Sequence, residues 1–402
     1  MSFQQGLSGL NAAAKNLDAI GNNVANANTV GFKQSQARFA DVYANSLNGG
    51  GGSQVGIGVK VAQIAQQFTQ GNITATNNAL DIAINGGGFF RMDTNGEATY
   101  QRNGQFQLDR QGFIVNPTGA KLTGYPANSN GVLLTGATVP LSISTADLVP
   151  QITTKVNAVL NLDSRGAVPA VTPFSMNDPL SFNNSTAVSV YDSLGNSHTL
   201  QTFYVKTAAN SWDVHASLDG GASFPAGSFT FDSAGALTSG SPMTIAPQPL
   251  TTGASPLGLS IDYTGTSQFG SAFSVNTLNQ DGYTSGRLGG FNIGADGIIL
   301  GRYTNGQSAV LGQVALANFS NPNGLQQLGN NQWAETSTSG TPLVGVPSSG
   351  SLGVLQASAV EDSNVDLTAE LVNMITAQRV YQANAQTIKA QDAVMQTLVN
   401  LR

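Results

Sequence analysis

Apolar residues at the start of the chain recur with helical spacing. From residue 2 to about residue 28 they alternate at intervals of four and three, which is typical of a helix with one narrow apolar stripe. Ser2 and Gln5 have the spacing of a capping box, and Gly31 is suited to a left-handed residue that ends the helix. We name this stripe, which Gly21 interrupts, the N-terminal seam: Phe3, Leu7, Leu10, Ala14, Leu17 and Val24. An ordinary amphipathic surface helix is the alternative interpretation.

The same alternation returns at the end of the chain, where no Gly or Pro occurs from Asn364 to Arg402. A helix of about 38 residues would be about 57 Å long, far beyond the mean length of about 11–12 residues. Ser363 with Asp366 predicts its N-cap. The stripe, which Gln378 and Asp392 interrupt, is the C-terminal seam: Leu367, Leu371, Met374, Tyr381, Ala385, Ile388, Met395 and Val399.

A helix this long with a narrow apolar stripe needs another helix to cover the stripe. The N-terminal segment is the one segment of comparable length and pattern. We therefore expect residues 1–30 and 359–402 to pair as a coiled-coil-like domain. Burial of two narrow stripes does little more than offset the entropy of ordering both helices. We expect these ends to order fully only when neighbouring chains cover them.

The middle of the chain has the pattern of β structure. In residues 31–70 we predict a linker with short strands, and a glycine tract supplies a hinge: Gly49, Gly50, Gly51 and Gly52. From Ile73 onward, short apolar runs alternate with turn signals at 93–96, 192–195, 232–235 and 304–306. These signals predict mainly antiparallel strands.

Two junctions divide this β region. Five prolines fall between residues 140 and 179, and a polar turn signal follows at 279–282. The predicted fold class is α+β, with a first β domain from 71–145 and 283–358. A second, outer β domain from 146–282 is inserted in the first.

Composition excludes several classes of protein. Charged residues make up 9% of the 402, the net charge is -6 and cysteine is absent. An acidic chain lacks the basic surface that nucleic acids require, and without cysteine there are no disulfides, catalytic thiolates or zinc thiolates. No apolar run reaches about 18 residues, so we expect no membrane insertion. The first residues also lack the features of a cleavable signal peptide.

Candidate catalytic groups are few. The two histidines, His198 and His215, have no motif partner, and strand alternation predicts that both face solvent. The acidic string at 93–97 resembles a calcium loop, but Ala98 and Gly104 stand where that loop needs Gly and Glu. No phosphate-binding or dinucleotide motif is present. We expect no enzyme activity, catalytic residue, metal or cofactor, although a pair of catalytic carboxylates has no fixed spacing and stays open.

Several segments resemble the bacterial flagellar axial proteins, the family of rod and hook subunits. Residues 8–33, SGLNAAAKNLDAIGNNVANANTVGFK, are similar to its N-terminal signature. Residues 364–367, NVDL, and 370–389, ELVNMITAQRVYQANAQTIK, are similar to its C-terminal signature. Residues 80–90 and 103–106 resemble its first β domain. The length, the opening MSF, the large middle region and the ending TLVNLR are most similar to the hook members.

This resemblance implies a structural subunit of the flagellar hook. Such a subunit polymerises with itself into a flexible curved tube, a universal joint that transmits torque from rod to filament. The implied partners are the hook-cap scaffold, the rod and hook–filament junction proteins, and the flagellar type III export apparatus. The implied location is the extracellular hook of the basal body, reached through the flagellar channel.

Two alternatives stay open at this point. A distal rod subunit would share both terminal signatures. A secreted β-rich adhesin or enzyme would instead need a cleft with converging polar groups, and it would have no use for two long terminal seams.

Overall fold

The computed structural model describes residues 2–42, 56–128 and 131–400. The predicted hinge at Gly49, Gly50, Gly51 and Gly52 lies outside these described residues. The chain forms two compact units. Unit 1 comprises Met1–Ser144, Gly290–Gly301 and Ser308–Arg402, and unit 2 comprises Thr145–Gly289 and Arg302–Gln307. Most of the structure is β, with one helix near each end of the chain.

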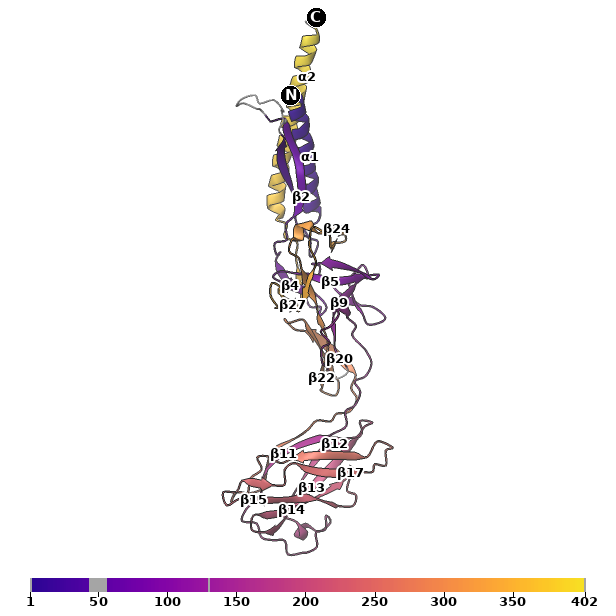
Figure 1. Cartoon of the computed structure of the whole chain (residues 1–402), viewed down its shortest axis with the longest axis vertical. Helices are drawn as coiled ribbons and strands as arrows, with labels where there is room; N and C mark the ends of the chain where they lie inside the picture. Colours follow the sequence, from indigo (N-terminus) through magenta and orange to yellow (C-terminus); the bar gives the residue numbers. More distant parts are fainter. Residues whose placement is uncertain (1, 43–55, 129–130, 401–402) are drawn as a thin grey trace. The chain divides into compact units, whose positions relative to one another are not determined.

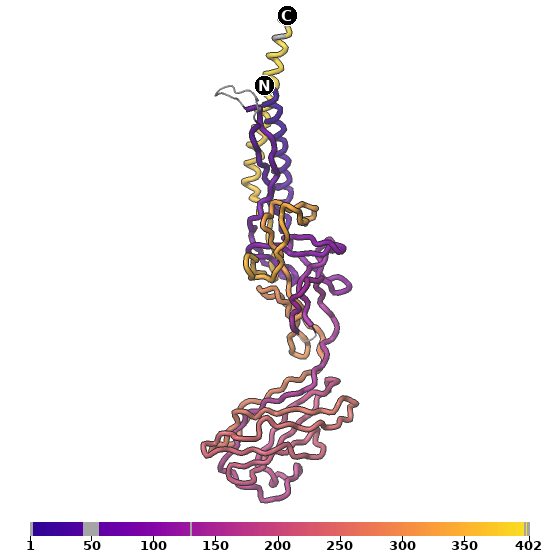
Figure 2. The backbone as a smooth tube through the Cα atoms, in the orientation of Figure 1, coloured from indigo at the N-terminus to yellow at the C-terminus, as the bar shows by residue number. Residues whose placement is uncertain are grey.

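Two helices and a strand ribbon make up one part of unit 1. Helix α1 (Ser2–Ala25) runs alongside α2 (Leu367–Asn400), as Figures 1 and 2 show. The antiparallel ribbon of β1 (Ser35–Val42) and β2 (Gly58–Gln66) packs against α1. The sequence indicated part of β2 but not β1, whose residues SQARFADV do not alternate regularly between apolar and polar.

The start of α2 is capped by Asp366. The backbone N–H groups of Thr368 and Ala369 donate to Asp366 Oδ1 at 2.9 and 3.1 Å. The prediction that Ser363 caps this helix is therefore wrong, because Ser363 Oγ accepts from the Val365 N–H in the preceding turn. A carboxylate is the better cap here, since it also interacts favourably with the helix dipole.

The end of α1 comes earlier than predicted. Gly31 does have the expected left-handed φ of 72°, but it lies six residues beyond Ala25. Its N–H donates to the backbone oxygen of Glu361 at 2.7 Å. The glycine thus joins the two ends of the chain rather than ending the helix.

The remainder of unit 1 is a β region around aromatic side chains. Its principal sheet runs in the order β22-β9-β5-β6-β25-β24, with β20 and β21 extending the path beyond β22. Phe89 and Trp333 pack edge to face at 5.7 Å between ring centroids, and Tyr100 and Phe319 do so at 4.8 Å.

The strands of this region are short, and β3 and β4 pair with strands from the end of the chain, β28 and β27. Their bounds are β3 (Ile73–Ala75), β4 (Ile82–Asn85), β5 (Phe89–Thr94), β6 (Glu97–Gln101), β7 (Gln107–Leu108), β8 (Ile114–Val115), β9 (Lys121–Pro126), β10 (Val139–Pro140), β20 (Leu288–Ile293), β21 (Ile298–Tyr303), β22 (Ser308–Val314), β23 (Leu316–Asn318), β24 (Gln326–Gly329), β25 (Gln332–Ala334), β26 (Leu343–Gly345), β27 (Val354–Ala357) and β28 (Ala359–Glu361). A 3-10 turn, η2 (Pro322–Gly324), precedes β24.

Unit 2 holds two sheets, in the orders β17-β18-β11-β19 and β12-β13-β14-β15-β16. Both contribute to one core that includes Leu160, Ile261, Tyr204 and Trp212. Strand β11 pairs in parallel with β18 and antiparallel with β19. The bounds are β11 (Lys155–Asn161), η1 (Pro179–Ser181), β12 (Asn184–Tyr191), β13 (Ser197–Ala208), β14 (Ser211–Leu218), β15 (Phe224–Phe231), β16 (Leu237–Ser239), β17 (Met243–Gln248), β18 (Leu257–Asp262) and β19 (Ser274–Gln280).

The predicted turns are confirmed. At 93–96, Asn95 and Gly96 take φ values of 56° and 93° and close the β5–β6 hairpin, while the Gly96 N–H donates to Asp93 Oδ1 at 2.7 Å. The turns that begin at Asp192 and Asp232 use the aspartate side chain in the same way. The acidic string at 93–97 is therefore a hairpin turn. None of the described helices is long and apolar enough to cross a membrane.

Candidate assembly surface and buried joint

The contact between α1 and α2 is made by small side chains. A Cβ added at Gly6 would lie 3.1 Å from Ile388 Cγ1, and one added at Gly9 would lie 2.7 Å from Asn384 Oδ1. Further along α1, Ala12, Ala13, Ala19 and Ile20 are buried. The helices therefore approach closely because one face of α1 carries little more than glycine and alanine.

The N-terminal seam lies mainly outside this contact. Phe3 and Leu7 are 51% and 43% exposed, and the other seam residues are half-buried. Glycine and alanine on one face let the helices pack closely, which leaves the larger side chains at the edge and on the outside. The seam is thus an apolar stripe at the surface of unit 1.

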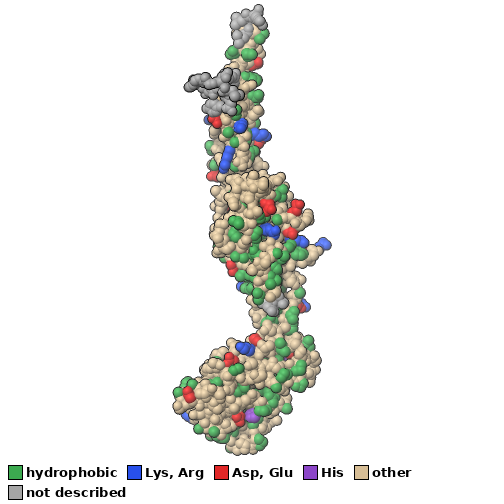
Figure 3. Space-filling view, in the orientation of Figure 1, with side chains coloured by type: hydrophobic (Ala, Val, Ile, Leu, Met, Phe, Trp, Pro, Cys, Tyr) green, Lys and Arg blue, Asp and Glu red, His purple; other side chains and the backbone are tan. Residues whose placement is uncertain are grey.

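Large apolar side chains are also exposed along α2. Of the C-terminal seam, Met374, Ala385 and Ile388 are half-buried, whereas Met395 and Val399 are 61% and 72% exposed. Other large apolar residues that the seam did not include are exposed on α2 as well: Val372, Ile375, Val380 and Val394. Figure 3 shows hydrophobic side chains between sparse charges on one face of the helices. We refer to these exposed apolar side chains, which lie among polar ones along the helix, as the outer stripe of α2.

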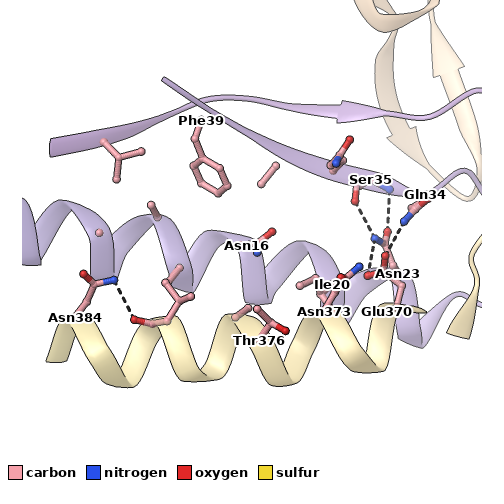
Figure 4. A pocket seen from close by; sticks show the side chains of 18 residues that line it. Asn16, Ile20, Asn23, Gln34, Ser35, Phe39, Glu370, Asn373, Thr376 and Asn384 are labelled. Atoms are coloured by element: carbon pink, nitrogen blue, oxygen red, sulfur yellow. Dashed lines mark hydrogen bonds between the residues drawn. The ribbon is translucent and has the colours of Figure 1, made fainter. Parts of the chain in front are cut away.

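A groove of about 680 Å³ lies between α1, α2 and the β1–β2 ribbon (Figure 4). Its lining is small and rich in amides, including Asn16, Asn373 and Asn384. Nothing in this lining provides a nucleophile with a neighbouring base, which acyl-transfer chemistry would require.

A polar cluster closes one end of the groove. Glu370 is buried, and its carboxylate accepts from Gln34 Nε2 at 2.6 Å and from Asn23 Nδ2 at 3.4 Å. The Asn23 amide also exchanges two hydrogen bonds of 2.8 Å with the backbone of Ser35. Glu370 and Asn23 thus connect α2, α1 and β1. Sequence reasoning missed this cluster because its members are 347 residues apart.

A buried group of three charges lies where the helical part of unit 1 meets its β region. Glu361 Oε1 lies 2.6 Å from Lys33 Nζ, and Glu361 Oε2 lies 3.1 Å from Arg102 Nη1. The three side chains are at most 4% exposed. Burial lowers the pKa of Lys33 and the pKa of Arg102, and the Glu361 carboxylate opposes both shifts. In a chain with 9% charged residues, three buried charges are a costly feature.

His198 in unit 2 is not at the surface, which corrects the sequence prediction. Its ring is buried, with Nδ1 2.6 Å from Asp219 Oδ2 and Nε2 3.2 Å from Asp192 Oδ2. Burial alone would lower the pKa of His198, but its hydrogen bonds to Asp219 and Asp192 outweigh burial and raise it. Strand alternation failed here because side chains of adjacent turns cover the position.

His215 is half-buried rather than free in solvent. Its ring stacks on Phe174 with 4.2 Å between centroids, and burial lowers its pKa. Among the residues that the structure describes, no group of three His, Asp or Glu side chains is placed to hold a metal ion.

Four family models match successive parts of the chain. Residues 3–33 match the model of the flagella basal body rod protein, and residues 83–168 match the flagellar hook protein FlgE/F/G D1 domain. Residues 161–283 match the flagellar basal body protein FlaE D2 domain. Residues 356–401 match the flagellar basal body rod FlgEFG protein C-terminal region. Terminal helices around these β domains define a flagellar axial protein.

Proteins that are similar over their full length show which member of this class the chain resembles. The flagellar hook protein FlgE of Salmonella typhimurium is 46% identical and that of Escherichia coli 44%, each with all of both chains covered. The hook protein of Borreliella burgdorferi is 34% identical over 100% of this chain and 99% of its own. The chain belongs to the flagellar hook protein family. A crystal structure of Helicobacter pylori FlgE2 has the same fold (TM-score 0.56, 16% identity), covering 72% of this chain and 100% of that one.

Proposed function

We propose that this chain is the structural subunit of a bacterial flagellar hook, and that it polymerises with itself into a flexible curved tube that transmits torque from rod to filament. The observation that carries the proposal is the exposed apolar surface of α1 and α2. Soluble monomers rarely leave apolar patches of this extent uncovered. The family of the chain is one of structural flagellar proteins.

In this proposal the terminal helices pair as the inner domain of the tube, and the two seams contact neighbouring copies. Phe3 and Leu7 on α1 and the outer stripe of α2 would become buried on assembly. The second β domain, inserted in the first, would lie in an outer layer. Support for this arrangement comes from the small-residue contact between the helices, which leaves the larger apolar side chains free for other chains.

The remaining partners follow from the same role. A hook subunit would meet the rod at one end of the tube, the junction proteins at the other, and a cap scaffold during growth. It would reach the tip through the flagellar channel by type III export. The alternatives of a distal rod subunit and of a secreted adhesin or enzyme lose support, because the full-length relatives reported above are hook proteins.

Substitution of the outer stripe tests this function. Val372→Glu and Ile375→Glu place charges at exposed apolar positions of α2, and Gln386→Glu is the matched control at an exposed polar position of the same helix. We expect the first two variants to keep the helix content of the free chain but to lose tubes in electron micrographs of cells. The control should form normal tubes. Normal tubes from the Val372→Glu/Ile375→Glu double variant would contradict the proposal.

A further inference from the structure

The helical part and the β region of unit 1 are connected by three chain segments, which we call the joint: residues 26–34, 67–72 and 361–366. The side chain of Glu361, which begins the third segment, bonds to the other two segments and to Arg102. Glu361 Oε1 accepts from Lys33 Nζ at 2.6 Å and from the Gly71 N–H at 3.0 Å. Its Oε2 accepts from Arg102, which follows β6, at 3.1 Å.

The partners of Glu361 are themselves anchored. Lys33 Nζ donates a second hydrogen bond to the Thr69 carbonyl at 2.7 Å, and Arg102 Nη2 donates to the Gly86 carbonyl at 2.8 Å. The Glu361 carbonyl accepts from the Gly31 N–H at 2.7 Å. Each of these bonds has a preferred direction, so together they admit one arrangement of the three segments.

Asn364 repeats the connection three residues later. Its Oδ1 accepts from the Gln34 N–H at 2.7 Å, and its Nδ2 donates to the Gln67 carbonyl at 2.8 Å. The joint is therefore fixed by two side chains of the segment that leads into α2.

Buried ion groups are seldom the most stable choice, since well-packed apolar residues of similar volume often replace them without loss of stability. Compared with apolar side chains, hydrogen-bonded charged groups add a preferred bonding direction, and they therefore favour a single register of the segments that they join. We propose that Glu361 is a positioning residue: it holds the terminal helices and the β region of unit 1 in one fixed orientation, so that force applied to one is passed to the other. The inference rests on the proposed function, since a torque-bearing subunit requires such coupling.

The cysteine-free chain allows a direct measurement. Spin labels at Ala369→Cys on α2 and Glu97→Cys on the β5–β6 turn, both exposed, would report the distance between the two parts of unit 1 by pulsed electron paramagnetic resonance. The full chain would be compared with Glu361→Gln, which keeps the shape of the side chain but removes its charge. Asp362→Asn is the matched control, because Asp362 is the adjacent acid and accepts one bond from Thr74 at 3.2 Å.

We expect a narrow distance distribution for the parent chain and for Asp362→Asn, and about a twofold broader one for Glu361→Gln, because loss of the carboxylate charge leaves two buried cations, Lys33 and Arg102, uncompensated. If Glu361→Gln does not fold, the triple variant Lys33→Met/Arg102→Met/Glu361→Leu is measured instead. Its apolar side chains preserve the packing but cannot form the directional hydrogen bonds of the ion group. Its distribution should also be broad.

An unchanged width in Glu361→Gln, or in the triple variant, would overturn the inference, because packing and the bonds of Asn364 would then orient the parts without Glu361. Tube formation by the parent chain is scored separately in electron micrographs. Absence of those tubes would refute the proposed function, while the distance widths would still decide the role of Glu361.

Discussion

Gly104 shows how one residue can fix a local path of the chain. It lies in the segment 103–106, where its carbonyl accepts a hydrogen bond from the Ile82 N–H at 2.9 Å. A Cβ added to Gly104 would clash with the backbone oxygen of Ile82. Any side chain would force the strand carrying Ile82 away from this segment. We expect Gly104→Ala to lower the free energy of unfolding of unit 1 by about 3 kcal/mol.

Chemical denaturation monitored by Trp333 fluorescence in unit 1 would measure this loss. Gly136→Ala is the control, because a Cβ there meets open space and its φ is not left-handed. That variant should stay within about 0.5 kcal/mol of the parent. Equal effects of the two substitutions would show that the contact with Ile82 is unimportant.

His198 makes the stability of unit 2 depend on pH. Its pKa is raised in the folded state, so its protonated form stabilises the fold below the ordinary histidine pKa of about 6.5. This contribution is lost as the pH rises through the raised pKa. At acid pH the sign reverses for Asp192 and Asp219, whose pKa values are lowered, because folding is favoured only while they are ionised.

The melting temperature of unit 2, followed by calorimetry from pH 5 to pH 9, tests this prediction. It should fall as the pH rises past the raised pKa of His198 in the parent chain, and His198→Asn should remove most of that fall. A parent profile as flat as that of the variant would contradict the prediction.

At the scale of elements, two of the three glycines of α1 have opposite roles. Gly6 faces Ile388 of α2, whereas a Cβ at Gly21 has no neighbour within 4 Å. Gly6→Val should push the helices apart and weaken their contact by about 1–3 kcal/mol. Gly21→Ala should instead stabilise the helix by about 0.5–1 kcal/mol.

Hydrogen exchange of the α1 amides would measure both effects in the free chain. Exchange should speed up with Gly6→Val and slow down with Gly21→Ala. A Gly6→Val chain that is as protected as the parent would show that close approach of the helices is not needed.

Sequence pattern predicted the elements better than their contacts. The spacing of Leu10 and Met374 identified both terminal helices, and turn signals such as DTNG at 93–96 and DSLG at 192–195 located the hairpin turns. Periodicity could not show which face of α1 meets α2, since the contact uses Gly6 and Gly9 rather than large side chains. It also could not show what Glu361 and His198 contact, because their partners come from elements that only folding brings together.

At the scale of the whole molecule, the low charge content bears on mechanics. Few ion pairs would have to break when neighbouring hook subunits slide past one another during bending. Adding opposite charges at exposed positions of unit 2, as in Asn276→Lys/Thr244→Asp, should stiffen the tubes and slow swimming where these charges pair between copies.

Motility in soft agar, together with the curvature of tubes in electron micrographs, would measure this effect. Asn276→Lys/Thr244→Lys is the control, since it adds charge without opposite partners. If the variant with opposite charges swims normally and forms tubes of normal curvature, the low charge content does not ease sliding between subunits.

Lys33 and Glu361 are separated by 328 positions in the chain. A polypeptide delivered end first in an extended form cannot bring them together until almost its entire length has emerged. Helices α1 and α2 would consequently stay apart throughout delivery, and closure of the ion group would be among the final steps of folding. In the proposed export, the apolar stripes would therefore take their final form only after the last residues arrive.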